Sequence, residues 1–223
     1  MMTVTTGIKK ADKLLGGGFP SKTAILVSGG PGSGKTLLAL NFLMEGVLKK
    51  EKCCYVSLNE TGEELLRACK GIESLSAAEK HVGKNLAIEH IPLGESITTK
   101  KFLDIIASYP KIDRLVIDNV NKLLMFSESD RFYRMKLSEL VRTLRGMGCT
   151  LLLCETKGEA IDTGNGEAFE CDGVISLSFL ELEEKPQRIL TFHKMRYASF
   201  DPKVPHEFVI SGKDLRLTES KII

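Results

Sequence analysis

The stretch Gly29-Gly30-Pro31-Gly32-Ser33-Gly34-Lys35-Thr36 decides the fold of this chain. It matches the pattern G-x-x-x-x-G-K-T, the phosphate-binding loop of nucleoside triphosphatases. A β-branched, apolar run precedes the loop over residues 23–28, and a helix-forming run without proline follows it over residues 37–50. The motif requires this order of strand, loop and helix.

The residue types in this loop are those that phosphate binding requires. Glycine lets the backbone curl so that successive N–H groups point at phosphate oxygens, and the start of the following helix adds partial positive charge. We expect Lys35 to reach the β- and γ-phosphates and the Thr36 hydroxyl to ligate Mg²⁺. This context favours phosphate binding over a glycine-rich turn that only joins a strand to a helix. The predicted nucleotide-binding residues are Gly30, Pro31, Gly32, Ser33, Gly34, Lys35, Thr36 and Leu37.

The composition is that of an ordinary globular chain. It has 223 residues, of which 43% are hydrophobic and 27% charged, which fits one α/β domain over residues 1–223. The net charge of +2 is too small to argue for nucleic acid. No run reaches membrane-spanning length and no basic-then-apolar leader opens the chain, so we expect an intracellular, cytoplasmic protein without a membrane partner. The six cysteines form no C-x-x-C pair, so we expect buried free thiols rather than a zinc site.

Strands and helices alternate early in the chain, and strands cluster late. Apolar runs predict strands over 53–58, 86–91, 114–118 and 150–154, and helices over 61–70, 100–108 and 129–147. A polar loop over 155–169, predicted to be mobile, precedes further predicted strands over 173–182, 187–196, 207–210 and 214–217. We therefore predict an α/β fold with a twisted, mostly parallel central sheet, flanked by helices and extended by antiparallel C-terminal strands.

The predicted strand over 114–118 ends in a carboxylate, Asp118. In phosphate-loop proteins such an acid lies beside the loop and holds the Mg²⁺ shell. The alternative is a role in a helix cap or a turn, because Asp and Asn, as in Asp118-Asn119, are common turn residues. The strand spacing and the upstream loop favour the metal role, with Thr36 and Asp118 as the predicted metal residues.

Taken together, these segments resemble the RecA-like ATPases, and within them the KaiC family. The resemblance runs from about Thr6 to Leu217, and its glycine lead-in and Lys-Met-Arg strand are more specific than the phosphate loop. The matching segments besides that loop are Thr6-Gly7-Ile8, Leu14-Leu15-Gly16-Gly17-Gly18-Phe19-Pro20, Val56-Ser57-Leu58-Asn59-Glu60-Thr61, Arg114-Leu115-Val116-Ile117-Asp118-Asn119-Val120, His193-Lys194-Met195-Arg196 and Phe208-Val209-Ile210.

The resemblance implies ATP binding at the subunit interfaces of a ring, commonly a hexamer, and a catalytic carboxylate after the second strand. The family pattern there is Glu-Glu, whereas this chain has Asn59-Glu60. A carboxylate can take a proton from the attacking water, but an Asn can only orient that water. We therefore assign the role of base to Glu60, against the alternative of a helix N-terminal acid favoured by the macrodipole.

Lys194 and Arg196 are two residues apart on a predicted strand, so both should point to the same face. The resemblance implies that they reach the γ-phosphate bound to the neighbouring subunit, where cations offset developing charge. The alternative is ordinary charge on an exposed strand. The predicted catalytic residues are therefore Glu60, Lys35, Lys194 and Arg196, and Glu155 matches a family Glu near the sensor position.

Three functional hypotheses follow. The first is a ring-forming, Mg²⁺-dependent ATPase, and the second is a weakly or non-hydrolysing module in which ATP holds an assembly that a partner protein recognises, motivated by Asn59. The third, a recombinase-like DNA-binding ATPase, is not favoured. The segment 157–169 holds Glu159, Asp162 and Glu167 against one lysine, which suits a phosphate backbone poorly. The cluster Arg131-Phe132-Tyr133-Arg134 could stack bases, but on a helix it is better explained as core and solvated face.

Overall fold

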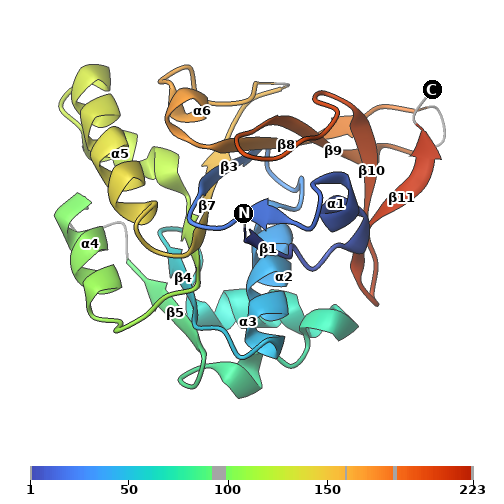
Figure 1. Ribbon diagram of the computed structural model, residues 1–223, viewed down its shortest axis with the longest axis horizontal. Helices are drawn as coiled ribbons and strands as arrows, with labels where there is room; N and C mark the ends of the chain where they lie inside the picture. The colour runs from blue at the N-terminus through green and yellow to red at the C-terminus, as the bar shows by residue number, and fades with distance from the viewer. Residues whose placement is uncertain (1, 92–98, 159, 183–184, 222–223) are drawn as a thin grey trace.

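The computed structural model describes residues 2–91, 99–158, 160–182 and 185–221. Its centre is a nine-stranded sheet in the order β11-β10-β9-β8-β3-β7-β6-β4-β5 (Figure 1). The strands from β8 to β5 are parallel, and β9, β10 and β11 extend the sheet antiparallel. The predicted mixed sheet, with a parallel core and antiparallel C-terminal strands, is confirmed.

Strands and helices alternate from β3 to β8, and the last four strands follow one another without a helix between them. The strands are β1 Thr3–Val4, β2 Phe19–Pro20, β3 Ala24–Gly29, β4 Cys53–Ser57, β5 Leu86–His90, β6 Arg114–Asp118, β7 Cys149–Glu155, β8 Gly173–Leu180, β9 Gln187–Met195, β10 Pro205–Ile210 and β11 Leu215–Lys221. The α-helices are α1 Lys9–Leu14, α2 Lys35–Leu48, α3 Gly62–Lys70, α4 Thr99–Ala107, α5 Asp130–Leu144 and α6 Glu167–Glu170. Three 3-10 helices are η1 Glu73–Leu75, η2 Ala78–His81 and η3 Val120–Phe126.

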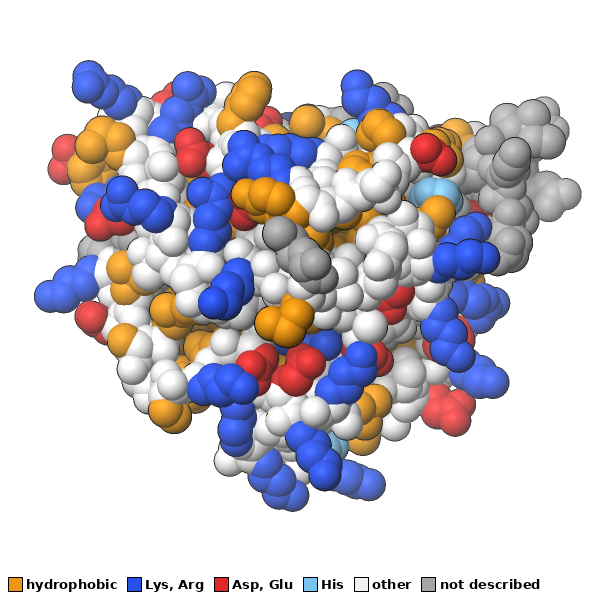
Figure 2. All heavy atoms as spheres, in the orientation of Figure 1, with side chains coloured by type: hydrophobic (Ala, Val, Ile, Leu, Met, Phe, Trp, Pro, Cys, Tyr) orange, Lys and Arg blue, Asp and Glu red, His pale blue; other side chains and the backbone are white. Residues whose placement is uncertain are grey.

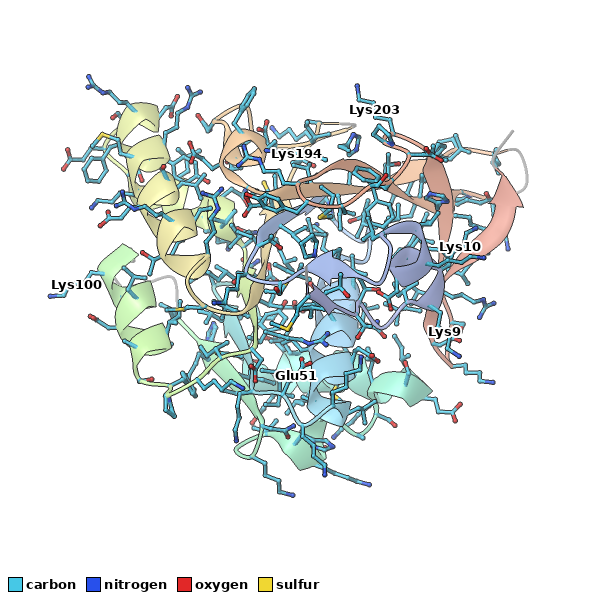
Figure 3. All side chains as sticks on the ribbon, in the orientation of Figure 1. Lys9, Lys10, Glu51, Lys100, Lys194 and Lys203 are labelled. Carbon is cyan, nitrogen blue, oxygen red and sulfur yellow. The ribbon has the colours of Figure 1, made fainter. Side chains whose placement is uncertain are left out.

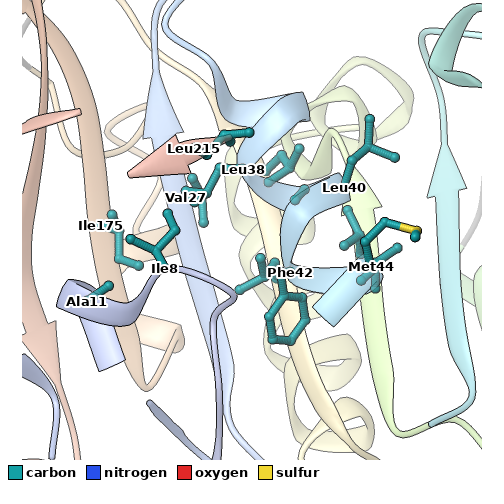
Figure 4. Packing of buried hydrophobic residues seen from close by; sticks show 14 of the residues in the cluster. Ile8, Ala11, Val27, Leu38, Leu40, Phe42, Met44, Ile175 and Leu215 are labelled. Carbon is teal, nitrogen blue, oxygen red and sulfur yellow. The ribbon is translucent and has the colours of Figure 1, made fainter. Parts of the chain in front are cut away.

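Both faces of the central strands are buried, as parallel strands flanked by helices require. Along β3, Ile25 and Val27 belong to the core on the side of α1, α2 and α3. Ala24 and Leu26 point the other way and belong to the core under α4 and α5. Figure 4 shows the first core, where Val27 of the sheet lies among apolar side chains of α2 such as Leu38. The nine-stranded sheet therefore lies between two helical layers, with the carboxyl ends of its parallel strands at one edge, and β1 and β2 form a separate two-stranded sheet.

The prediction of a mobile loop over 155–169 is wrong in one part, because the end of this segment belongs to the helical turn α6. Glu167 in this turn is completely buried, and its Oε1 accepts hydrogen bonds from Tyr133 Oη at 2.9 Å and Thr163 Oγ1 at 2.5 Å. Four residues are too few to show a helical period in the sequence. Glu159 lies outside the described residues.

The cysteine side chains lie in the interior of the protein. All six cysteines are free and buried, as expected. No group of three or more metal-ligating side chains occurs within the described ranges. Over those same ranges, no helix has the length and apolarity needed to cross a membrane.

A buried arginine, Arg114 at the start of β6, joins three parts of the chain. Its side chain is completely buried, and Nη1 donates to the carbonyl oxygens of Thr5 at 2.6 Å and Phe42 at 2.8 Å. Its Nε pairs with Glu51, which is labelled in Figure 3, and the guanidinium lies 4.7 Å from the centre of the Phe42 ring. Arg114 thus ties the N-terminal lead-in and α2 to the sheet.

We expect Arg114→Ala to lower the free energy of unfolding by about 3 kcal/mol or more, because it leaves a cavity and buried carbonyls without donors. Urea denaturation measures this. The control is Arg142→Ala, which removes an exposed arginine of α5 and should change stability by less than about 0.5 kcal/mol. Equal effects of the two substitutions would contradict the role of Arg114.

Candidate nucleotide-binding site

The phosphate loop connects the buried end of β3 to the first turn of α2. Gly34 is the N-cap of α2 with a φ of 102°, and Gly32 has a φ of 72°, values that favour glycine. A Cβ at Gly29 would lie 2.4 Å from the carbonyl oxygen of Leu177 in β8. The glycines therefore allow both the left-handed turn and the close approach of the loop to the neighbouring strand.

This loop offers donors that fit a polyphosphate. The first N–H groups of α2 have no partner within the helix, and the helix dipole places partial positive charge there. Lys35 Nζ lies over the loop, donating to the carbonyl oxygens of Gly29 at 2.8 Å and Gly30 at 2.9 Å. Ser33 Oγ is buried without a hydrogen-bond partner in the described part of the chain. Burial lowers the pKa of the Lys35 ammonium, and the charge of Asp118 opposes this shift.

Asp118 lies beside the loop, as the sequence predicted. Its carboxylate is almost completely buried, and Oδ2 accepts a hydrogen bond from Tyr55 Oη at 2.6 Å and lies 3.5 Å from Thr36 Oγ1. Burial raises the pKa of Asp118, while the hydrogen bond from Tyr55 opposes the rise. A hydroxyl and a carboxylate oxygen are the hard ligands that Mg²⁺ prefers, so the donor set of Thr36 and Asp118 fits this ion.

The pair Asn59-Glu60 lies at the same edge of the sheet as Asp118. Asn59 Nδ2 donates to Asp118 Oδ1 at 3.3 Å. Glu60 is half-buried, and burial followed by the charge of Asp118 raises the pKa of its carboxyl, against a hydrogen bond with Thr36. The capping role at α3 belongs to other residues, because Thr61 is the N-cap and Glu64 completes the capping box. Glu60 directly precedes the N-cap, so both its role as base and the alternative of an acid favoured by the helix dipole stay predictions.

An open pocket of about 520 Å³ lies next to the loop, a size suited to a small ligand. Its wall combines the start of α2 with Glu60, α3 residues and the turn after β10. Arg188 also lines it, and its Nε donates to the carbonyl oxygen of Gly32 at 3.3 Å while its guanidinium lies 5.3 Å from the Phe179 ring centre. The sequence analysis missed Arg188, because only the β8–β9 pairing of Phe179 with Arg188 brings it to the loop.

Lys194 and Arg196 do not join this group of residues. Lys194 pairs across the sheet with Val174, and Val174 pairs with Leu26, three residues before the end of β3. This places Lys194 about 10 Å of strand away from the level of Gly29. Figure 3 shows Lys194 beside α6, where Nζ donates to three backbone carbonyl oxygens. The chain thus separates its predicted finger residues from its own phosphate loop.

Arg196 and Lys194 contact the same short segment, which ends at Asp172. Lys194 Nζ lies 3.0 Å, 3.3 Å and 2.6 Å from the carbonyl oxygens of Ala168, Phe169 and Cys171. Arg196 Nη1 lies 3.5 Å from Asp172 Oδ1, and the buried Asp172 also accepts from Arg145 Nε at 2.9 Å. The two cations thus contact one segment, but Arg196 lies just beyond β9 rather than on the strand, which the sequence predicts to extend to residue 196.

Several known proteins are similar to this chain over almost its whole length. A solved structure, the KaiC-like protein PH0186 of the hyperthermophilic archaeon Pyrococcus horikoshii, superposes with a TM-score of 0.83 at 28% sequence identity, covering 97% of this chain and 99% of that one. The UPF0273 protein PH0284 of the same species is 28% identical over 99% of this chain and 95% of its own length. A UPF0273 protein of Thermotoga maritima is also 28% identical, over 98% and 96%.

The family model described as "ATPase: KaiC" matches residues 4–221, from the lead-in to the last strand. This span includes the phosphate loop, Asp118 and the strand that carries Lys194. The fold is KaiC/RecA-like, as the sequence predicted. The chain belongs to the KaiC family of ATPase domains.

Proposed function

We propose that this protein is a Mg²⁺-dependent ATPase that assembles into a ring, commonly of six subunits in this family, with ATP bound at each subunit interface. The observation that carries the proposal is the convergence of Lys35, Thr36, Asp118 and Glu60 at one edge of the sheet, beside an open pocket. Family membership supports nucleotide binding. Within one chain Lys194 and Arg196 lie away from the phosphate loop, so under this proposal the neighbouring subunit supplies them.

Under this proposal each residue of the site has a separate role in hydrolysis. The N–H groups of the loop and Lys35 would bind the phosphates, and Thr36 and Asp118 would hold the metal ion. A Mg²⁺ ion held there would supply positive charge that offsets the charge of the phosphates. Glu60 takes the proton of the attacking water, and Lys194 and Arg196 of the neighbouring subunit offset the charge that develops on the transferred group.

Mixing two inactive variants tests whether sites are shared. Lys35→Ala keeps its finger residues, and Arg196→Ala keeps its phosphate loop. We expect each alone to lose at least about 100-fold in ATP turnover. In randomly mixed rings at equal amounts, about a quarter of the interfaces combine an intact loop with an intact Arg196, and turnover should recover to that level.

The matched control for this mixture is Lys35→Ala with the double variant Lys35→Ala/Arg196→Ala, which cannot form a complete interface and should stay inactive. Light scattering establishes ring assembly in both mixtures. Wild-type turnover per subunit should rise with protein concentration as rings form. Mixed rings without recovery, or full activity in a demonstrated monomer, would show that the sites are not shared.

Substitution of Glu60 tests its assignment as base. Glu60→Gln keeps the shape of the side chain but removes proton acceptance, so we expect turnover to fall about 100-fold or more, with ATP affinity changed less than about threefold. Glu64→Gln is the control, because it removes an exposed carboxylate four residues away while glutamine still fits the capping box, so turnover should not change. Undiminished turnover in Glu60→Gln would exclude the role of base.

A second candidate function is a nucleotide-dependent assembly that hydrolyses ATP slowly and is recognised by a partner protein. The observation that favours it is the contact of Asn59 Nδ2 with Asp118 Oδ1, at a position where the family has an acid. If the missing acid limits the rate, Asn59→Glu should raise turnover sharply, by about tenfold or more, whereas Asn59→Gln should not. Steady-state ATPase measurements decide this, and an unchanged rate in Asn59→Glu counts against the second candidate.

Nucleic acid is not favoured as a partner. In the cluster at 131–134, Tyr133 is buried and its hydroxyl donates a hydrogen bond to Glu167. Arg134 Nη2 donates to the carbonyl oxygen of Gly164. Arg131 and Phe132 remain exposed in this cluster. Figure 2 shows lysine and arginine side chains scattered over one face of the molecule rather than gathered into a continuous track.

A further inference from the structure

A buried tyrosine hydroxyl lies in the candidate site without a role in the chemistry described above. Tyr55 is the middle residue of β4 and is completely buried. Because β4 and β6 pair in parallel with Tyr55 opposite Val116, Tyr55 and Asp118 lie on the same face of the sheet. The Tyr55 hydroxyl lies 2.6 Å from Asp118 Oδ2, the distance of a strong hydrogen bond to a charged group.

The Tyr55 hydroxyl holds the oxygen of Asp118 that faces the phosphate loop. Asp118 Oδ2 is also the atom 3.5 Å from Thr36 Oγ1, whereas Asn59 Nδ2 approaches Oδ1. A carboxylate oxygen has two lone pairs, so a donor on one side leaves the other free to face Thr36. The hydroxyl of Tyr55 therefore fixes both the rotation of the carboxylate and the direction in which it can accept a ligand.

Core packing alone does not account for Tyr55. Its ring belongs to the core under α2, and a phenylalanine would fill the same space. A buried hydroxyl costs free energy unless it is paired, and the partner here is the predicted metal carboxylate. The hydroxyl thus has a role that the apolar core does not require.

We propose that Tyr55 is a positioning residue for the divalent cation, holding the Asp118 carboxylate toward Thr36 so that the two oxygens can act together. The proposal rests on the proposed function, because it concerns the same Mg²⁺–ATP site. Outer-shell hydrogen bonds of this kind set metal affinity by orienting the ligand. Tyr55 does not touch the reacting atoms and acts through Asp118.

The test is the Mg²⁺ dependence of nucleotide binding in Tyr55→Phe, with Tyr133→Phe as matched control. Tyr133 is also fully buried, and its hydroxyl also donates to a buried carboxylate, Glu167 Oε1 at 2.9 Å, but away from the phosphate loop. A fluorescent ATP analogue is titrated in EDTA and then at increasing Mg²⁺. This measures cation and nucleotide binding without turnover.

We expect Tyr55→Phe to raise the half-saturating Mg²⁺ concentration roughly tenfold, with nucleotide affinity in EDTA within about twofold of wild type. Tyr133→Phe should leave both quantities within about twofold. In an Asp118→Asn background, Tyr55→Phe should add less than about a twofold further change, because its effect passes through that carboxylate.

Two outcomes overturn the proposal. The first is a Mg²⁺ dependence of Tyr55→Phe that equals that of wild type or of Tyr133→Phe, while wild type itself requires Mg²⁺; the proposed function then stands and only the role of Tyr55 fails. The second is wild-type nucleotide binding that does not depend on Mg²⁺, in which case the metal site of the proposed function fails together with the positioning role.

Discussion

The parallel pairing of β3, β7, β6 and β4 is the constraint on which the rest of the structure depends. Its register sets Gly29 opposite Glu155, and Asp118 between Ser57 and Leu153. The segments that follow β3, β4 and β6 therefore leave the sheet at one edge, where the carboxyl ends of parallel strands form a crevice. A slip of one residue in β6 would turn Asp118 to the opposite face, away from Thr36 and Tyr55.

Strand β6 shows how one element serves stability and chemistry together. Arg114 and Asp118 stand at its two ends, and the period of two places both on the face that α2 covers. Arg114 is enclosed by backbone carbonyls and by Glu51. Asp118 instead contacts Thr36, which lines the open pocket. The same strand thus anchors the lead-in at one end and presents a carboxylate to the nucleotide site at the other.

Features that are local in sequence could be predicted, and features created by pairing could not. The phosphate loop, Asp118 at a strand end and the capping box of α3 each have a distinctive spacing, and the structure places them as expected. Tyr55 looks like any aromatic residue of a buried strand, and Arg188 like any exposed charge. Only the neighbours supplied by the register distinguish them.

The short helix α6 contains a second feature that the sequence could not predict. Glu167 is one of three acids in a polar segment, and the sequence analysis counted it as surface charge. The structure buries it completely against Tyr133 and Thr163. Composition alone cannot distinguish a solvated acid from a buried one whose oxygen accepts hydrogen bonds from hydroxyl groups, such as that of Tyr133 in α5. The charge that this segment offers to solvent is therefore smaller than the sequence suggests.

The contacts of Lys194 bear on what ring assembly requires. An ammonium has three donors, and Lys194 Nζ meets three carbonyl oxygens at the end of α6. Under the proposed shared site, a phosphate of the neighbouring subunit competes with these carbonyls, and its full negative charge gives the stronger hydrogen bond. Such an exchange would leave the carbonyl oxygens of Ala168, Phe169 and Cys171 without the Lys194 ammonium. Under that proposal, nucleotide bound to one subunit would be coupled, through Lys194, to the α6 segment of the next.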